Sequence, residues 1–284
     1  MTSVSVPTVI DEHTVLTRVH DRLRDAATDA TVSTVVSGDS VVFVELSTDA
    51  GQTTGVAHLP AGEMPDIGGR TAAPLAGWAI DADAPVARRA VGLATLNALS
   101  APHVHWRSGD PMAALAADVD RITTVGLFRP AFRKFSGVDV RVVERDPEAI
   151  AVADLESGDD VSVSLYGPDE CGEAFAGADV AFVTGSTLIY GGLERYLAAA
   201  GDDTLVVLIG ATASILPEPC FAAGIDVLAG VEVVDSAAVH ERITAGDCGT
   251  GLHGAGLRKG FVAAESPAGL DLPATERKRT PADR

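Results

Sequence analysis

Residues 180–192 read VAFVTGSTLIYGG, and residues 205–214 read LVVLIGATAS. Each stretch begins with an uninterrupted apolar run and then passes into glycine and small hydroxyl residues. Strands that are buried on both faces, as in a parallel sheet covered by helices, have this pattern. The two stretches therefore predict successive parallel strands whose following loops form opposite walls of one crevice.

Strand and helix patterns alternate over residues 109–265, which predicts a Rossmann-like α/β domain with a parallel sheet. The expected strands are 122–127, 138–143, 180–184, 205–209 and 225–228. The expected helices lie near 111–118, 130–136, 169–176, 188–200, 217–222 and 236–245. Residues 246–260 are rich in glycine, and residues 266–284 are predicted to form a disordered tail.

Residues 1–108 show a different order, in which one helix precedes three successive strands and two more helices follow them. This order predicts a smaller α+β domain in front of the Rossmann-like one. The expected strands are 32–37, 41–46 and 53–59, and the expected helices are 11–30, 72–80 and 84–99.

The composition limits the classes of function. Asp and Glu number 40 against 21 Lys and Arg, so the formal net charge is −19, which opposes binding to nucleic acid and anionic lipid. No run approaches the ~20 apolar residues of a membrane span, and the first residues lack the pattern of a secretion signal. We therefore expect a cytoplasmic protein without nucleic-acid or membrane partners.

Lysine is scarce: only 3 of the 21 basic residues are Lys. Together with the acidic excess this favours a halophilic protein, whose self-repulsion is screened in high salt. An acidic mesophilic protein with biased codon usage is the alternative. A homodimer is compatible with the sequence, although nothing in it specifies one.

Two candidate site segments follow the first two strands of the α/β domain. Gly126 would let backbone approach a ligand and Arg129 could meet an anion, although a simple strand-to-helix turn explains both. Glu144 ends the next strand, 18 residues after Gly126, where an acid commonly accepts ribose hydroxyls. A G-x-G-x-x-G fingerprint is absent from the sequence, and an exposed surface acid is the alternative reading of Glu144.

The two opening stretches supply the other segments. Ser186 or Thr187 is expected to cap a following helix, whose free N–H groups would form an anion cradle; capping alone is the alternative. Gly210–Ser214 follows the next strand, so we expect both loops at one crevice. Serine hydrolase chemistry at Ser186 is disfavoured because G-x-S-x-G is absent.

Several stretches resemble the Putative heavy-metal chelation family: TGSTLIYGGLERYL at 184–197, VVLIGATASILPEPCFAAGIDVLAGVEVVD at 206–235, and the shorter VGLFRPAF, VVERDP and VGLATLNALS. The resemblance covers most of residues 11–245. It implies an enolase N-terminal-like domain before the Rossmann-like domain, with a site between them that is partly similar to Rossmann-like methyltransferases. It also implies a role near metal chelation or the metabolism of a pterin-like or siderophore-like chelator.

The resemblance implies Glu144 and Asn97 as the catalytic candidates, Asn97 coming from the first domain. The family places Asn where Tyr190 stands here, which puts an amide contact at this position in doubt. The expected ligand-binding residues, including the backbone of Ala211, are Gly126, Phe128, Thr184, Gly185, Ser186, Thr187, Gly210 and Ala211.

Direct metal binding has little support in the sequence. The spacings C-x-x-C, H-x-x-x-H and H-E-x-x-H are absent. Cys and His come near each other only at Asp247-Cys248 and His253, and a packed or disordered loop also explains that proximity. We expect a small polar or anionic metabolite as ligand, with enzymatic activity undecided. The alternatives are a non-catalytic metal or metallophore binder and an S-adenosylmethionine-type cofactor protein. The sequence specifies neither the reaction nor a cofactor or metal.

Overall fold

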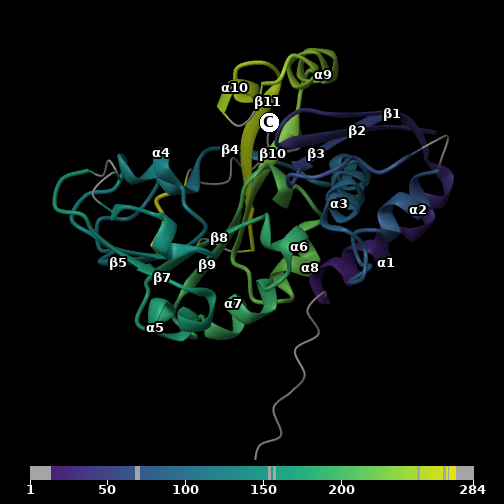
Figure 1. Cartoon of the computed structure of the whole chain (residues 1–284). Helices are drawn as coiled ribbons and strands as arrows, with labels where there is room; N and C mark the ends of the chain where they lie inside the picture. Colours follow the sequence, from purple (N-terminus) through teal and green to yellow (C-terminus); the bar gives the residue numbers. More distant parts are fainter. Residues whose placement is uncertain are drawn as a thin grey trace, which may run out of the picture.

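In the residues that the structure describes, the chain forms an eight-stranded and a three-stranded β-sheet (Figure 1). The structure is a computed structural model, and it describes residues 14–67, 71–152, 155, 158–247, 250–264, 267 and 269–272. The larger sheet contains β4 (Arg107–Ser108), β5 (Arg121–Val125), β6 (Asp139–Val143), β7 (Ser162–Tyr166), β8 (Val180–Thr184), β9 (Leu205–Ile209), β10 (Val227–Val233) and β11 (Leu257–Ala263).

The spatial order of the larger sheet is β4-β11-β10-β9-β8-β5-β6-β7. The run from β10 to β7 is parallel throughout, whereas β11 and β4 are antiparallel additions at one edge. In chain order the parallel strands are arranged 3-2-1-4-5-6, which is the doubly wound Rossmann order. The predicted fold class is confirmed, and the order reverses between β5 and β8.

Short helices connect the strands of this sheet (Figure 1): α4 (Arg129–Phe132), α5 (Cys171–Phe175), α6 (Thr187–Tyr190), α7 (Leu193–Ala199), α8 (Pro217–Phe221), α9 (Ser236–Thr244) and α10 (Thr250–His253). The helix expected near 188–200 is divided into α6 and α7. Gly191 and Gly192 have φ of 84° and 92°, a left-handed backbone that interrupts an α-helix. Near 111–118 only a single 3-10 turn forms, at Pro111–Ala113.

Two segments predicted to lack regular structure are ordered where they are described. Residues 257–260 of the glycine-rich segment form the first part of β11, which continues to Ala263 and in which Phe261 is fully buried. In the predicted disordered tail, Leu270 is buried and the Asp271 N–H donates to the Ala114 carbonyl at 2.7 Å. The tail prediction is therefore wrong for residues 269–272, because the apolar side chain of Leu270 is buried in the core. Residues 273–284 lie outside the described residues.

The smaller sheet is antiparallel and contains β1 (Thr31–Ser37), β2 (Val41–Thr48) and β3 (Gly51–His58). The helices α1 (Thr14–Asp29), α2 (Ala72–Gly77) and α3 (Val86–Ser100) accompany it (Figure 1). These elements match the predicted order of one helix, three strands and two helices. Residues 11–13 of the expected first helix lie outside the described residues. The likeness to an enolase N-terminal domain stays a prediction.

Helix α3 is buried on nearly every side, which is typical of a helix enclosed by other elements. It packs on β2 and β3 and also touches α6 of the larger unit. One apolar cluster accordingly runs from Val15 of α1 to Leu228 of β10. The two sheets thus share a continuous core, and the division of the chain at residue 108 stays a prediction. No helix in the described part of the chain is long and apolar enough to cross a bilayer.

Close packing of β3 on α3 predicts a large effect of adding one methyl group. A Cβ at Gly55 would lie 2.2 Å from the Ala94 carbonyl oxygen and 2.3 Å from the Ala98 nitrogen. We expect Gly55→Ala to lower the free energy of unfolding by about 1–3 kcal/mol through overpacking, measured by urea denaturation. Gly77→Ala is the control, because a Cβ there meets nothing within 4 Å. Equal stability of the two variants would contradict this packing.

Candidate functional site

A cavity of about 370 Å³ lies between the carboxyl ends of β8 and β9 and the antiparallel sheet. The larger unit contributes Thr184, Gly185 and Ser186 after β8 and Gly210, Ala211 and Thr212 after β9. The opposite wall is formed by the ends of β2 and β3, and it includes Ser40, Ala57 and His58. Arg145, Tyr190, Leu252, His253 and Leu257 are further lining residues. The two loops therefore line one cavity, as predicted. The prediction that they form opposite walls is wrong, because the loops lie against each other on one wall and the antiparallel sheet supplies the opposite one.

The loop after β8 is held by its own hydroxyl groups. The Thr187 hydroxyl donates to the Thr184 carbonyl at 2.7 Å, and the Thr184 and Ser186 hydroxyls are 3.2 Å apart. Ser186 stands at the N-cap position of α6, as predicted, but its side chain makes no capping bond, and Thr187 is already the first residue of the helix. Thr184 and Ser186 therefore face the cavity, whereas Thr187 is buried behind them.

Glycine allows the loops after β8 and β9 to touch. The Gly185 N–H donates to the Ile209 carbonyl at 2.7 Å, and a Cβ on Gly185 would lie 2.8 Å from the Ala213 nitrogen. Gly210 has φ of 123°, which favours glycine. Gly185 is therefore needed for the close approach of the two loops, and Gly210 for the left-handed backbone at the turn after β9.

His58, Tyr190 and Arg145 form a cluster on the other side of the cavity. His58 Nε2 lies 3.2 Å from the Tyr190 hydroxyl, and the Arg145 guanidinium lies 4.0 Å from the centre of the Tyr190 ring. Burial lowers the pKa of His58 and the charge of Arg145 lowers it further, against a hydrogen bond to the Ser40 backbone. A neutral imidazole that donates to Ser40 leaves Nε2 to accept the Tyr190 hydroxyl proton.

The sequence did not indicate this cluster. Tyr190 was noted only as a departure from the expected Asn, and His58 is 132 residues away in the chain. A hydrogen bond over that separation leaves no local pattern. Tyr190 occupies the position in the cavity at which the resemblance implied an amide, and it offers a hydroxyl group there.

Glu144 directly follows β6, the neighbour of β5 in the sheet, and it does not line this cavity. Its carboxylate accepts the Leu127 N–H at 2.7 Å and the Arg145 N–H at 3.2 Å. Glu144 thus joins the loops after β5 and β6. Gly126 lies beside the site wall, since a Cβ there would be 3.1 Å from Thr184 Cγ2. Phe128 does not line this cavity and instead faces a neighbouring one.

Asn97 connects the two sheets. Its side chain is 1% exposed, and its amide nitrogen lies 2.7 Å from the Val56 carbonyl and 3.2 Å from the Thr212 carbonyl. A longer contact of 3.4 Å reaches the Ala211 carbonyl. Asn97 therefore acts on the site wall through backbone groups, which makes it a positioning residue and does not match the expected catalytic contact.

The described residues do not supply a ligand set for a resident metal ion. Among them, no three His, Cys, Asp or Glu side chains gather closely enough to hold one. His58 is engaged by Ser40 and Tyr190, and Asp247 accepts a hydrogen bond from Arg242. Cys248, part of the weak Cys/His pattern, lies outside the described residues.

The fold and cavity define a doubly wound α/β protein with an antiparallel sheet placed over the carboxyl edge of its parallel strands. The chain belongs to the family described as Putative heavy-metal chelation. One family model with this description matches residues 112–260, and a second with the same description matches residues 20–100. The resemblance stated from the sequence is confirmed at the level of the family.

The relatives have no assigned function. An uncharacterized protein of Methanocaldococcus jannaschii is 26% identical over 157 residues, covering 53% of this chain and only 56% of that relative. A solved structure of unknown function from Pyrococcus horikoshii has a TM-score of 0.72 at 19% identity, covering 88% of this chain and 99% of the other. Another, from Desulfitobacterium hafniense, has a TM-score of 0.63 at 16% identity, covering 87% and 98%. Both belong to the same family and support the fold alone.

The two histidines of the cavity predict a loss of stability in mild acid. Burial lowers the pKa of His58 and of His253 below 6.5, so the unfolded chain takes up these protons first as the pH falls. The free energy of unfolding should be fully retained above about pH 6.5 and should decline below it. We expect urea denaturation at pH 8 and pH 5.5 to show this decline.

The His58→Gln/His253→Gln double variant should lose less stability between the two pH values than the parent chain. The exposed pair His103 and His105 provides the control, as a matched double Gln variant. If the parent and the His58/His253 variant lose the same stability on acidification, the neutral state of these two half-buried rings is contradicted.

Proposed function

We propose that the chain binds a small, polar, anionic metabolite in the cavity between the two sheets, and that this metabolite is a metal chelator or a chelator precursor. The observation that carries the proposal is the convergence of the Thr184, Ser186 and Tyr190 side chains with Arg145 on that one cavity. Pterin-like and siderophore-like compounds are the expected ligand classes.

The donor chemistry of the cavity supports an oxygen-rich ligand. Hydroxyl groups donate and accept hydrogen bonds, and a guanidinium pairs with a carboxylate in a planar, two-pronged arrangement. Arg145 also offsets, at the site, the repulsion that a chain of net charge −19 exerts on an anion. A metal would reach this cavity already bound by the metabolite, which agrees with the lack of a protein ligand set among the described residues.

A ribose-containing cofactor such as S-adenosylmethionine is the second candidate. The strand order and the position of Glu144 at the end of β6 favour it, because an acid there commonly accepts ribose hydroxyls. The backbone bonds of Glu144 occupy one lone pair on each oxygen, so acceptor capacity remains. Loss of S-adenosylmethionine binding in Glu144→Gln would identify this candidate.

A thermal-shift screen separates the candidates. The probes are citrate, neopterin and 2,3-dihydroxybenzoate, each with and without ferric ion, then S-adenosylmethionine, and zinc or nickel ions alone. A ligand that binds only the folded chain raises Tm, and the shift grows with the logarithm of the ratio of ligand concentration to dissociation constant. We expect stabilisation by at least one of the three oxygen-rich probes. Stabilisation by S-adenosylmethionine alone, or by free metal alone, would replace the proposal with the corresponding alternative.

Two substitutions test where the stabilising probe binds. Arg145→Gln removes the cation and should weaken binding about tenfold or more, whereas Ser186→Ala removes one neutral hydrogen bond and should weaken it about two- to tenfold. Isothermal titration calorimetry provides the measurement. The matched controls are Arg24→Gln and Ser37→Ala, at exposed positions on α1 and β1. Unchanged affinity in both test variants would place the ligand elsewhere.

A further inference from the structure

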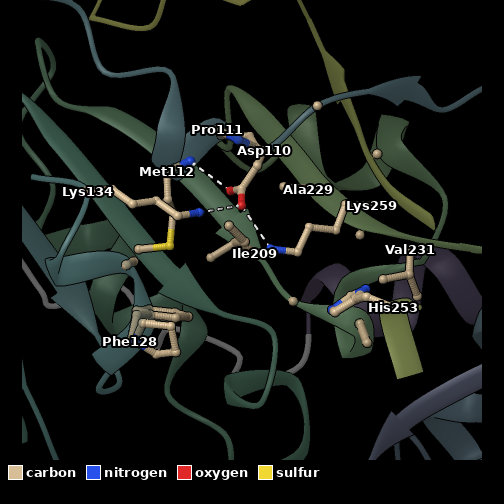
Figure 2. A pocket seen from close by; sticks show the side chains of 17 residues that line it. Asp110, Pro111, Met112, Phe128, Lys134, Ile209, Ala229, Val231, His253 and Lys259 are labelled. Atoms are coloured by element: carbon tan, nitrogen blue, oxygen red, sulfur yellow. Dashed lines mark hydrogen bonds and ion pairs between the residues drawn. The ribbon is translucent and has the colours of Figure 1, made fainter. Parts of the chain in front are cut away.

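A second cavity, of about 210 Å³, is shown in Figure 2. The two cavities have Gly210, Ala211 and His253 in common, so they lie on either side of one thin wall. The second cavity opens between α4, the segment before β5 and the strand pair β10–β11. Phe128, which was predicted from the sequence to bind a ligand, lines this second cavity and not the first.

The rim of this cavity carries two of the three lysines in the chain. Lys134 Nζ and Lys259 Nζ lie 3.1 Å and 2.8 Å from the same oxygen, Asp110 Oδ2 (Figure 2). Burial opposes ionisation of Asp110, but the hydrogen bonds and charges of both lysines outweigh it and lower its pKa. Two ammonium groups against one carboxylate leave a net charge of +1 in a chain of −19.

Both lysines keep donors available. An ammonium has three N–H groups, and the described contacts of each lysine use one of them, on Asp110. The lysine side chains are 43% and 47% exposed, so their charges remain at the mouth of the cavity. An anion that binds there gives up little of its hydration, which keeps the electrostatic cost of binding low.

The interior of the cavity is apolar. Figure 2 shows Met112, Phe128 and Ile209 on the walls, with Ala229 and Val231 from β10. Burying the apolar part of a ligand against these side chains is favourable, whereas they have no polar group that could bind a small hydrated anion such as phosphate. The cavity therefore combines an apolar interior with a cationic rim.

We propose that this second cavity binds a small carboxylate with an apolar, ring-sized body. The carboxylate meets Lys134 and Lys259 at the rim, and the ring lies between Met112, Phe128 and Ile209. Asp110 holds the two ammonium groups together while the site is free. This site is independent of the function proposed for the first cavity, because it uses different charged groups.

Benzoate is the probe, and benzamide is its neutral counterpart of equal shape. We expect calorimetry to detect benzoate with a dissociation constant no weaker than about 10 mM, and benzamide and phosphate to bind at least about tenfold more weakly. Benzoate affinity should fall between 0.1 M and 1 M salt, because the screening length shortens from about 10 Å to about 3 Å. No benzoate binding, or equal binding of benzoate and benzamide, would overturn the proposal.

Charge variants locate the probe. Lys134→Met/Lys259→Met should weaken benzoate binding at least about tenfold. Arg22→Met/Arg24→Met removes the same charge from α1, which does not line the cavity, and should leave the affinity unchanged. Circular dichroism checks that both variants fold. Equal benzoate affinity in the lysine variant and this control would overturn the proposal.

A charge reversal gives a second, independent test at the same rim. Lys134→Glu/Lys259→Glu should lose benzoate and gain benzylammonium, because the apolar walls stay while the rim changes sign. The expected result is an inverted preference between the two probes. An unchanged preference in this variant would overturn the proposal even if the methionine variant failed to fold.

Discussion

Direct main-chain contact between the loops after β8 and β9 is the constraint on which the site depends. The Gly185 N–H binds the Ile209 carbonyl, and Ala213 lies too close to Gly185 for any side chain there. This contact puts the hydroxyls of Thr184 and Ser186 on the same wall as the Gly210 turn. The parallel register of β8 and β9 makes the contact possible, since their carboxyl ends reach the same edge of the sheet.

The antiparallel sheet completes the site because it shares a core with the parallel one. The largely buried α3 packs on β2 and β3, and Asn97 extends from it to carbonyls of both β3 and the loop after β9. That connection holds His58 within hydrogen-bonding distance of Tyr190. The smaller sheet thus serves as one wall of the cavity, and its stability and the geometry of the site are coupled.

The net side-chain charge at each of the two cavities is opposite in sign to the net charge of the chain. The chain is strongly acidic, yet Arg145 lines the first cavity and Lys134 with Lys259 lines the second. In a chain whose overall field repels anions, cations at these mouths create local attraction where a ligand would enter. The two cavities share His253 but differ in the rest of their linings, since hydroxyl groups and His58 line the first and mainly apolar side chains line the second.

The sequence by itself determined the fold class, the bounds of β8 and β9, and the meeting of their loops, because continuous apolar runs and glycine turns are local signals. It did not predict the break between α6 and α7 or the strands β7 and β11. No residue of β7 is fully buried, and Gly260 interrupts the apolar residues of β11. Only the tertiary structure brought His58 to Tyr190, and Asp110 to Lys259 across 149 positions. Such pairs depend on how the two sheets pack and on how the chain connections bring distant loops together. A local sequence pattern carries no information about either.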